Sequence, residues 1–554
     1  MDHDPARDRD TSDTCESVFN QTPPLVDYNL LESDPVLCDA LSREGGDFAR
    51  AELTVAGAEL GRPENFDAAR LANQFTPSLK THDARGVRVD RIEFHPAWHG
   101  LLRDVTRRRL HSGPWAHPRA GAHVARAACY FMQTQIESGT LCPTTMTYGA
   151  IPAMRRDALL LREWVPTLLS DCYDPRDIAF GKKTGGMVGM GMTEKQGGSD
   201  VRANTTRASR QPDGSYRLRG HKWFYSAPQC DAHLVLAQSE EGLSCFFVPR
   251  FTPDGNKNGV LIQRLKDKLG NRSNASAEVE FDEAYATPLG EPGRGIPTIL
   301  EMGTYTRLDC VTGTAGLMRQ VVAQALHHAR HRSVFGALLS RQPLMQVVLA
   351  DLCLESAAAT VLALRLARAF DAAEGDEGES AFRRVVTPAA KFWVCKRGPE
   401  VAAEAMEVLG GNGYIEELPL ARIYREMPVN SIWEGSGNVM CLDMLRGLSR
   451  NLAGRSALEL ELGQASGVNA DFDAARVALL SRLDGAAWSE GEARHLAWQL
   501  ITLLQAALLL RSAQVALGDA FCRTRLTASR GSVFGSYGGA IATDEVIAAS
   551  WLDA

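Results

Sequence analysis

A single block of strand-like sequence, residues 188–289, lies between long stretches with helical spacing, and this order constrains the fold more than any other feature. Within the block, short β-like runs are separated by turn residues, and Asp213-Gly214 marks a hairpin. After this turn, Tyr216 and Leu218 alternate with charged residues. On both sides of the block, apolar residues recur at spacings of three and four. The pattern predicts a small β-barrel or sandwich between helical domains.

The same order predicts a multidomain α+β protein, because 554 residues exceed what one hydrophobic core usually serves. Polar, turn-rich residues at the start of the chain are expected to form an arm that orders only by packing on other parts. The expected segments are an arm at 1–35, a helical domain at 36–187, the β domain at 188–296, a helical bundle at 297–445 and an additional helical domain at 446–554.

Composition and charge exclude several classes of protein. The chain is 45% hydrophobic and 23% charged, as in a globular protein. The most apolar stretch, residues 496–510, is interrupted by polar residues, so no membrane span is expected. The N-terminus lacks the apolar core of a secretory signal, and the cysteines show no metal-ligand spacing, which predicts a cytoplasmic protein without a metal site. The formal net charge of −7 gives no global attraction for nucleic acid.

The most informative motif is GMGMTEKQGGSDV, residues 189–201, on a loop that enters the β region. It is not a dinucleotide-binding fingerprint, because Glu194 stands where the last glycine is needed, and it lacks the Gly-Lys-Ser/Thr of a P-loop. The Thr193 and Ser199 hydroxyls enclose two glycines, which let a ligand approach backbone N–H groups closely. This loop is therefore a candidate site for a phosphate or a ring acceptor.

Several motifs together resemble one family. MTEKQGGSDV, KWFYSAPQCDAHLVLAQ and RLKDKLGNRSNASAEVEFDEA, in this order, are similar to segments of the acyl-CoA dehydrogenases and are closest to the AidB branch. The resemblance runs from about residue 21 to at least residue 446. It implies an acyl-CoA dehydrogenase-like fold with a helical domain, a β-barrel and a four-helix bundle, FAD as cofactor, and a homotetramer.

The resemblance also implies which residues bind FAD. An aromatic ring can stack on the flat isoalloxazine and a hydroxyl can bond its edge. Arg332 and Phe335, in RSVFG, are expected to reach the FAD of a neighbouring subunit, because an arginine fork suits a pyrophosphate. The other expected contacts are Met192, Thr193, Gly198, Ser199, Phe224, Tyr225, Ser226, Gly410, Gly411, Trp433, Gly435, Ser436 and Asn438.

Glu434, in IWEGSGN, matches the catalytic base of the family. Such a base removes the proton α to a thioester carbonyl while hydride leaves the β carbon for the flavin. Its apolar and glycine neighbours would desolvate the carboxylate and raise its pKa toward the range useful for proton transfer. An acyl-CoA is the expected substrate, and its candidate contacts are Thr193, Ser199, Ser226 and Arg307.

Two arginines, Arg307 and Arg425, coincide with arginines of the family. Each could contact the substrate or a subunit, but a structural ion pair explains each of them at least as well.

The chain continues for about a hundred residues past the end expected of an ordinary member, within the size of a small added domain. The AidB resemblance implies that this extension binds double-stranded DNA nonspecifically in the response to alkylation damage. Residues 446–554 hold ten arginines, no lysine and eleven acids, which is a weak electrostatic footprint. The candidate DNA contacts are Arg446, Arg450, Arg511, Arg523, Arg525 and Arg530.

Three functions remain open from the sequence. The first is an AidB-like flavoprotein that oxidises an acyl-CoA and binds DNA. The second is a metabolic acyl-CoA dehydrogenase whose extra domain only assembles the oligomer. The third is a flavin-dependent oxidase on the same fold, since oxygen reactivity depends on solvent access to the flavin.

Overall fold

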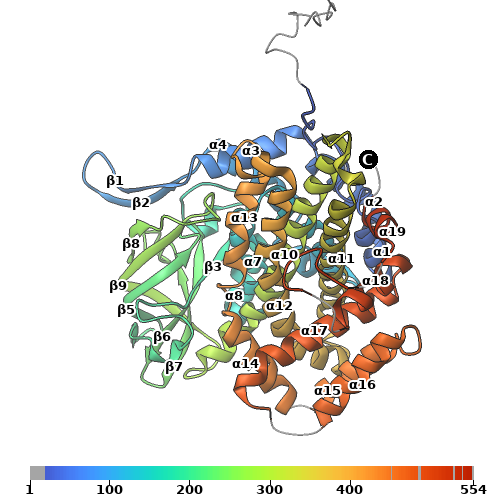
Figure 1. Cartoon of the computed structure of the whole chain (residues 1–554). Coiled ribbons are helices and arrows are strands. Elements are labelled where there is room, and N and C mark those ends of the chain that lie inside the picture. Colours follow the sequence, from blue (N-terminus) through green and yellow to red (C-terminus); the bar gives the residue numbers. More distant parts are fainter. Residues whose placement is uncertain (1–18, 451, 485–487, 528–530, 539–540, 552–554) are drawn as a thin grey trace, which may run out of the picture.

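The computed structural model describes residues 19–450, 452–484, 488–527, 531–538 and 541–551. A β-barrel stands beside a large body of helices (Figure 1). The first part of the predicted arm lies outside the described residues. Its later part packs on the protein, since Leu25, Tyr28, Leu30 and Leu31 are buried.

The N-terminal region is mostly helical, as expected. Proline and a capping side chain fix several helix starts: before α1, the Asp34 carboxylate accepts a hydrogen bond from the Leu37 N–H at 3.0 Å. The helices are α1 (Pro35–Arg43), α2 (Arg50–Leu60), α3 (Pro63–Gln74), α4 (Pro96–Arg107), α5 (Gly113–Ala116), α6 (Ala122–Ile136), α7 (Leu141–Met154), α8 (Ala158–Glu163) and α9 (Val165–Leu168).

One element departs from the expected helical pattern. Strands β1 (Ser78–His82) and β2 (Arg88–Glu93) form an antiparallel hairpin that projects beside the barrel (Figure 1). The Asp83 carboxylate closes its turn by accepting hydrogen bonds from the N–H groups of Arg85 and Val87, both at 2.9 Å. The alternation of RVDRIE is short, and this explains why helical spacing around it hid the strand.

The predicted β region forms a closed ring of strands. Pairing runs β6–β4–β5–β9–β7 and returns from β7 to β6, while β3 pairs with β6 and β8 with β9. Alternate side chains fill the barrel interior, among them Leu218, Val235 and Phe246. The strands are β3 (Val188–Gly191), β4 (Arg207–Arg210), β5 (Tyr216–Ser226), β6 (Ala232–Ser239), β7 (Gly242–Pro249), β8 (Val260–Leu265) and β9 (Ser276–Leu289).

The next part is a bundle of long, nearly all-buried helices, and the predicted fold class is confirmed. Helix α10 has 37 residues and packs against α6, α7, α11 and α12. The bundle consists of α10 (Gly295–His331), α11 (Pro343–Ala372), α12 (Glu377–Leu409), α13 (Pro419–Asn430) and α14 (Gly437–Arg450), with a short hairpin of β10 (Ser333–Val334) and β11 (Ala337–Leu338) after α10. Short 3-10 turns are η1 (Asp47–Ala49), η2 (Phe180–Lys182), η3 (Val201–Ala203), η4 (Leu339–Arg341), η5 (Gly410–Tyr414) and η6 (Glu490–Glu492).

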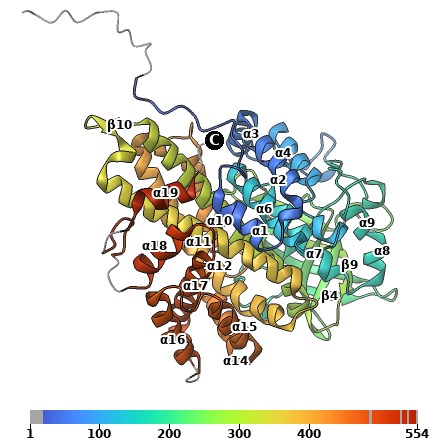
Figure 2. The ribbon, with the colours of Figure 1, turned by 90° about the vertical axis from the view of Figure 1, so that its right-hand side faces the viewer.

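The C-terminal helices dock on this bundle rather than standing apart from it. Helix α17 packs on α11 and α12, and apolar side chains such as Leu496, Leu504 and Phe521 join the hydrophobic cluster of the bundle. Figure 2 shows these helices spread along one side of the bundle, from α15 and α16 at the bottom to α19 near the top. They are α15 (Leu452–Gly463), α16 (Ala470–Asp484), α17 (Ala493–Leu510), α18 (Val515–Arg525) and α19 (Thr543–Ser550).

Two helical stretches in the described part of the chain have the length and hydropathy of a membrane span, namely α11 and Glu490–Leu510. Their most apolar windows are 89% and 72% buried inside the protein. Burial in the fold therefore explains their apolar character.

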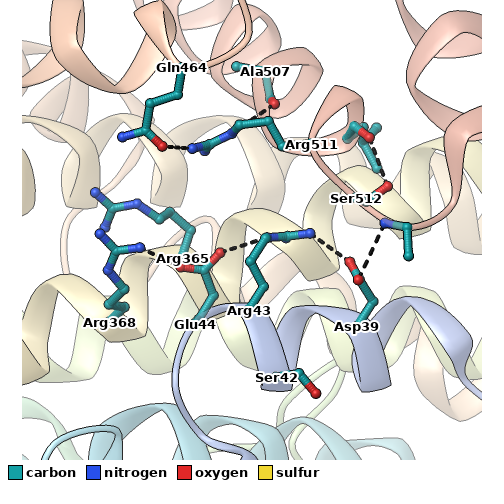
Figure 3. A network of polar contacts seen from close by, with 12 residues as sticks. Asp39, Ser42, Arg43, Glu44, Arg365, Arg368, Gln464, Ala507, Arg511 and Ser512 are labelled. Atoms are coloured by element: carbon teal, nitrogen blue, oxygen red, sulfur yellow. Dashed lines mark hydrogen bonds and ion pairs between the residues drawn. The ribbon is translucent and has the colours of Figure 1, made fainter.

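A polar network ties the additional helices to the rest of the protein (Figure 3). Arg43 of α1 bonds Asp39 at 2.6 Å and Glu44 at 3.0 Å, and Asp39 accepts a hydrogen bond from the Ala513 N–H. Arg511 donates to Glu461 and Gln464. Its guanidinium thus helps to hold the domain together, and its role as a DNA contact stays a prediction.

Arg525 requires a correction to the predicted DNA surface. Its buried guanidinium pairs with Asp351 and with Glu355 of α11, the latter at 3.2 Å. A side chain enclosed in this way cannot meet a phosphate. Arg446 and Arg523 are exposed, whereas the Arg450 side chain and Arg530 lie outside what the structure describes.

Candidate active site

Glu434 lies in a short loop between α13 and α14 whose backbone is unusual. Glu434 has φ +58° and Gly435 has φ +104°, so two successive residues adopt the left-handed region. For a residue with a side chain this conformation costs about 1–3 kcal/mol. The surrounding contacts must therefore hold the loop in place.

Two buried cations supply those contacts. Lys391 of α12 is 1% exposed and donates to the carbonyl oxygens on either side of Glu434, at 2.7 Å to Trp433 and 2.5 Å to Gly435. Arg307 of α10 donates to the Glu434 carbonyl at 3.0 Å and pairs with Asp443 at 2.9 Å. Three successive carbonyls are thus fixed from two helices, and this orients the Glu434 side chain.

The carboxylate itself faces α10. Thr306 donates a hydrogen bond to Glu434 Oε2 at 2.5 Å. Burial raises the pKa of Glu434 above its usual value of 4.5, and the Thr306 hydrogen bond, Arg307 and Lys391 oppose that rise. Desolvation prevails, so the carboxylate is a stronger base than an exposed glutamate.

Thr306→Val should raise the pKa of Glu434 further, because it removes a hydrogen bond to the ionised carboxylate. If Glu434 acts as a base, the rate of flavin reduction should rise with pH as it ionises, and in this variant the rise should occur at higher pH. Stopped-flow rates across the pH range measure the shift. Thr304→Val is the control, since the Thr304 hydroxyl donates to the Leu300 carbonyl of its own helix. Equal profiles for both variants would refute this role of Thr306.

Lys391→Met should slow flavin reduction by up to about a hundredfold, because small misplacements of a reacting group can cost that much. The variant loses the two hydrogen bonds from Lys391 to the Glu434 loop, while that from Arg307 remains. FAD content and the visible spectrum should stay close to those of the wild type. The slower rate could then not be attributed to loss of the cofactor. Lys80→Met, at an exposed position on β1, is the control. A rate equal to that of the wild type would show that Lys391 does not position the base.

The predicted flavin loop, residues 192–199, follows β3, and contacts with other residues of the β domain hold it in place. The fully buried Glu194 pairs with Lys222 of β5 at 2.8 Å and accepts from the Thr205 N–H at 2.7 Å. The backbone N–H of Trp223 donates to the Thr193 carbonyl at 2.9 Å. A Cβ atom at Gly198 would lie 2.5 Å from the Thr193 hydroxyl, which explains the glycine there. The Glu194–Lys222 pair was missed by sequence reasoning, since the two residues are far apart in sequence.

Strand β5 divides the three predicted flavin contacts between two faces. Tyr225 is 2% exposed, belongs to the barrel core and stacks on His233 at 3.9 Å between ring centroids. Its prediction as a flavin contact is wrong, because side chains alternate along a strand. Phe224 is 52% exposed and Ser226 is partly buried, both on the other face.

Cys142 of α7 hydrogen-bonds with Ser226 and lies within electrostatic range of Glu434. Burial raises the pKa of the Cys142 thiol to about 12; Glu434 adds to this rise, whereas a hydrogen bond with Ser226 opposes it. Met192 and Trp433 pack against the same apolar cluster, to which Cys142 also belongs. The apolar cluster that contains Cys142 thus borders Met192 of the predicted flavin loop, Ser226 of β5 and Trp433 beside Glu434.

These residues fit a flavin ring. The half-exposed Phe224 offers an aromatic face for stacking, and the Ser226 and Thr193 side chains offer hydroxyls for polar ring edges. When bound, FAD supplies the acceptor for a hydride. Gly435, Ser436 and Asn438 follow Glu434 directly, where they can approach the same group.

The remaining predicted cofactor residues form a second group at the far end of the bundle. Arg332 lies 25 residues beyond Arg307 in sequence, about 38 Å along α10. Residues 20–21 join this group, since Asn20 bonds Arg332 and Ser333, and Gln21 bonds Asn412 beside Gly410 and Gly411. Within one subunit, Arg332 and Phe335 cannot reach the ring site near Glu434. Phe335 is 100% exposed at φ +49°.

The two family arginines have structural partners. Arg425 forms an ion pair with Glu416. Arg307 bonds the Glu434 carbonyl and Asp443, so its prediction as a substrate contact has no support from the geometry. The described residues contain no group of three or more His, Cys, Asp or Glu that could hold a metal ion.

Comparison with known proteins identifies the family. Residues 20–175 match the adaptive response protein AidB N-terminal domain, 189–284 the acyl-CoA dehydrogenase middle domain, and 293–449 the acyl-CoA dehydrogenase C-terminal domain. The AidB protein of Escherichia coli (strain K12), whose name assigns it provisionally to the acyl-CoA dehydrogenases, is 49% identical over 93% of this chain and 95% of its own length.

Solved structures agree with this assignment. ACDH-11 of Caenorhabditis elegans in complex with C11-CoA has a TM-score of 0.82 and 27% identity, and the match covers 91% of this chain and 92% of that one. The apo form of Bd2924 has a TM-score of 0.79 and 28% identity over 89% of this chain and 99% of that one. The matched acyl-CoA dehydrogenase domains and the likeness to AidB support the expected cofactor, FAD, and the oxidoreductase class. The protein belongs to the acyl-CoA dehydrogenase family, as an FAD-dependent oxidoreductase of the AidB type.

Proposed function

We propose that the protein oxidises the Cα–Cβ bond of an acyl-CoA thioester, with Glu434 as the base that removes the α proton. The observation that carries the proposal is the position of Glu434. Burial raises the pKa of its carboxylate, and Lys391 and Arg307 fix its backbone. ACDH-11, which shares this fold, was solved with an acyl-CoA.

The test is an anaerobic titration of the FAD-loaded protein with acyl-CoAs of different chain length. A suitable acyl-CoA should bleach the visible flavin band, and the product should be the 2-enoyl-CoA. No bleaching at any chain length would remove the proposal. Rapid reoxidation of the reduced protein by dissolved oxygen would favour the oxidase alternative.

We also propose that the active unit is a homotetramer and that the protein is cytoplasmic. The support for an oligomer is the fully exposed Phe335, which lies beside Arg332 and far from the ring site of its own subunit. A second copy would bring this pair to its neighbour's cofactor. Phe335→Ala should therefore lower both FAD affinity and the mass measured by light scattering; a monomeric wild type with full FAD content would contradict this.

We propose nonspecific binding of double-stranded DNA, in the response to alkylation damage, as a second function. Its support is the likeness to AidB together with the exposed Arg446, which has no ion-pair partner in the described ranges. Affinity for unrelated duplexes should fall with salt, and Arg446→Gln should reduce the slope of that dependence by about one. Absence of binding to DNA at low salt would refute this second function and favour a metabolic acyl-CoA dehydrogenase.

A further inference from the structure

Asp443 of α14 links two arginines that come from different helices of the bundle. One oxygen of its carboxylate pairs with Arg307 of α10 at 2.9 Å, and the other pairs with Arg384 of α12 at 2.7 Å. Arg384 is about half exposed, whereas Arg307 is buried. Because Arg307 also bonds the backbone of Glu434, Asp443 is the anionic partner of a buried cation beside the proposed base.

Arg307 is bound at two of its three guanidinium nitrogens. Nε donates to the backbone carbonyl of Glu434 at 3.0 Å, and Nη1 donates to Asp443. In the described part of the chain, Nη2 has no hydrogen-bond partner. A guanidinium has five N–H donors and stays charged at any pH in the working range of a protein. Arg307 therefore has the capacity to bond a further acceptor if Asp443 loses its charge.

The Glu434 carboxylate lies close to this guanidinium. It packs against the turn of α10 just before Arg307: Thr306 donates to its Oε2 at 2.5 Å, and a Cβ atom at Gly303 would lie 4.0 Å from the same oxygen. Between Arg307 and the carboxylate, both within the described ranges, the structure shows no ion pair. Burial raises the pKa of Glu434, and the charge of Arg307 is among the effects that oppose this rise. A guanidinium released from Asp443 would thus have a neighbouring anion.

The other titratable groups near the Glu434 carboxylate, in the part of the chain that the structure describes, come from α7, α10 and α12. Lys391 of α12 donates to two backbone carbonyls of the loop. Burial raises the pKa of the thiols of Cys142 on α7 and Cys310 on α10, so both are neutral at pH 7. Arg307 is therefore the cation whose position depends on an exchangeable side-chain partner.

We propose that Asp443 is a positioning residue for the Glu434 base: it holds Arg307 on the backbone of the loop and keeps the guanidinium off the Glu434 carboxylate. The inference rests on the proposed function, in which Glu434 removes the α proton. A carboxylate paired with an arginine is a weaker base, because the opposite charge stabilises its ionised form. Asp443 thus preserves the basicity that burial gives to Glu434.

Asp443→Asn tests this, because it keeps the size of the side chain and removes its charge. Arg307 should then turn toward Glu434, and the ionisation of Glu434 should move to lower pH, since losing the anion and gaining the cation both favour the ionised carboxylate. Infrared difference spectra of the FAD-loaded protein across the pH range measure this ionisation. The Glu434 signal is the one that Glu434→Gln removes. The measurement needs no turnover, so it gives a result even if no acyl-CoA is oxidised.

Arg307→Gln shows whether the effect passes through the guanidinium. In that background, adding Asp443→Asn should move the ionisation of Glu434 much less than it does alone, because residues in one network are coupled. Asp443→Glu keeps the charge and should restore most of the wild-type titration, and Asp443→Ser is a second variant without the charge. Asp171→Asn breaks an ion pair with Arg109 in the N-terminal region; it is the control and should leave the titration of Glu434 unchanged.

Stopped-flow reduction of FAD by an acyl-CoA gives a second readout. In Asp443→Asn the rise of the rate with pH should begin at lower pH. The limiting rate at high pH should fall by up to about tenfold, since catalytic efficiency follows the strength of the base. Equal titration of Glu434 in the wild type and in both uncharged variants would overturn the inference, and so would an equal shift with and without Arg307. A wild type in which Glu434 titrates as expected but no acyl-CoA reduces FAD would count against the proposed function alone.

Discussion

Glu434→Gln should slow the anaerobic reduction of bound FAD by an acyl-CoA about 10²- to 10⁴-fold, the usual contribution of a general base. The amide keeps the size of the carboxylate and can still accept the Thr306 hydrogen bond, so FAD binding and the visible spectrum should be retained. Stopped-flow absorbance gives the rate. Glu417→Gln, which changes an exposed carboxylate just before α13, is the matched control. Its FAD should be reduced at the wild-type rate.

The same variant tests the environment of the carboxylate through stability. Because the folded-state pKa of Glu434 is raised, its stabilising contribution is present below the usual value of 4.5 and is lost as pH rises through the folded pKa. At neutral pH Glu434→Gln should therefore be at least as stable as the wild type. A variant that bleaches as fast as the wild type, or one clearly less stable at neutral pH, would contradict the assignment.

Arg525→Met should lower the free energy of unfolding by about 3–5 kcal/mol, because it leaves buried carboxylates short of a cation. Arg525 joins α18 to Asp351 and Glu355 of α11, and Glu355 also pairs with Arg397. Urea denaturation measures the loss. Arg446→Gln removes an exposed arginine and should change stability by no more than about 0.5 kcal/mol.

Variants of Arg525 and Arg446 also distinguish a structural role from a role in DNA binding. If Arg525→Met were as stable as the wild type but lost affinity for duplexes, the structural role assigned to Arg525 would be wrong. If Arg446→Gln alone weakened binding, the surface near α14 would be supported as the contact.

Local patterns were enough to predict the architecture. The alternation after Asp213-Gly214 marks β5, and the apolar spacing of residues 295–331 marks α10. Glu434 could be singled out because its neighbours are apolar residues and glycines. The strand period, applied strictly, would also have separated Tyr225 from Phe224 and Ser226, since three successive residues of a strand cannot share one face.

Local patterns could not predict ion pairs and hydrogen bonds between residues far apart in sequence. Arg525 finds Asp351 across 174 positions, and Lys391 meets the Glu434 loop across more than 40. The net charge of residues 446–554 is a measure of attraction for DNA only if every arginine is exposed. Arg511 and Arg525 instead serve as internal ion-pair partners. A lysine within the apolar run TPAAKFWVC was the one available signal for a buried cation.

A crystal structure of the FAD-loaded protein tests the central claim most directly. Density for the isoalloxazine ring is expected on the outer face of β5, in contact with Phe224 and Ser226, with the Glu434 carboxylate facing the bound acyl group at the ring. Density for the ring elsewhere, or a Glu434 side chain turned away from it toward solvent, would contradict the account.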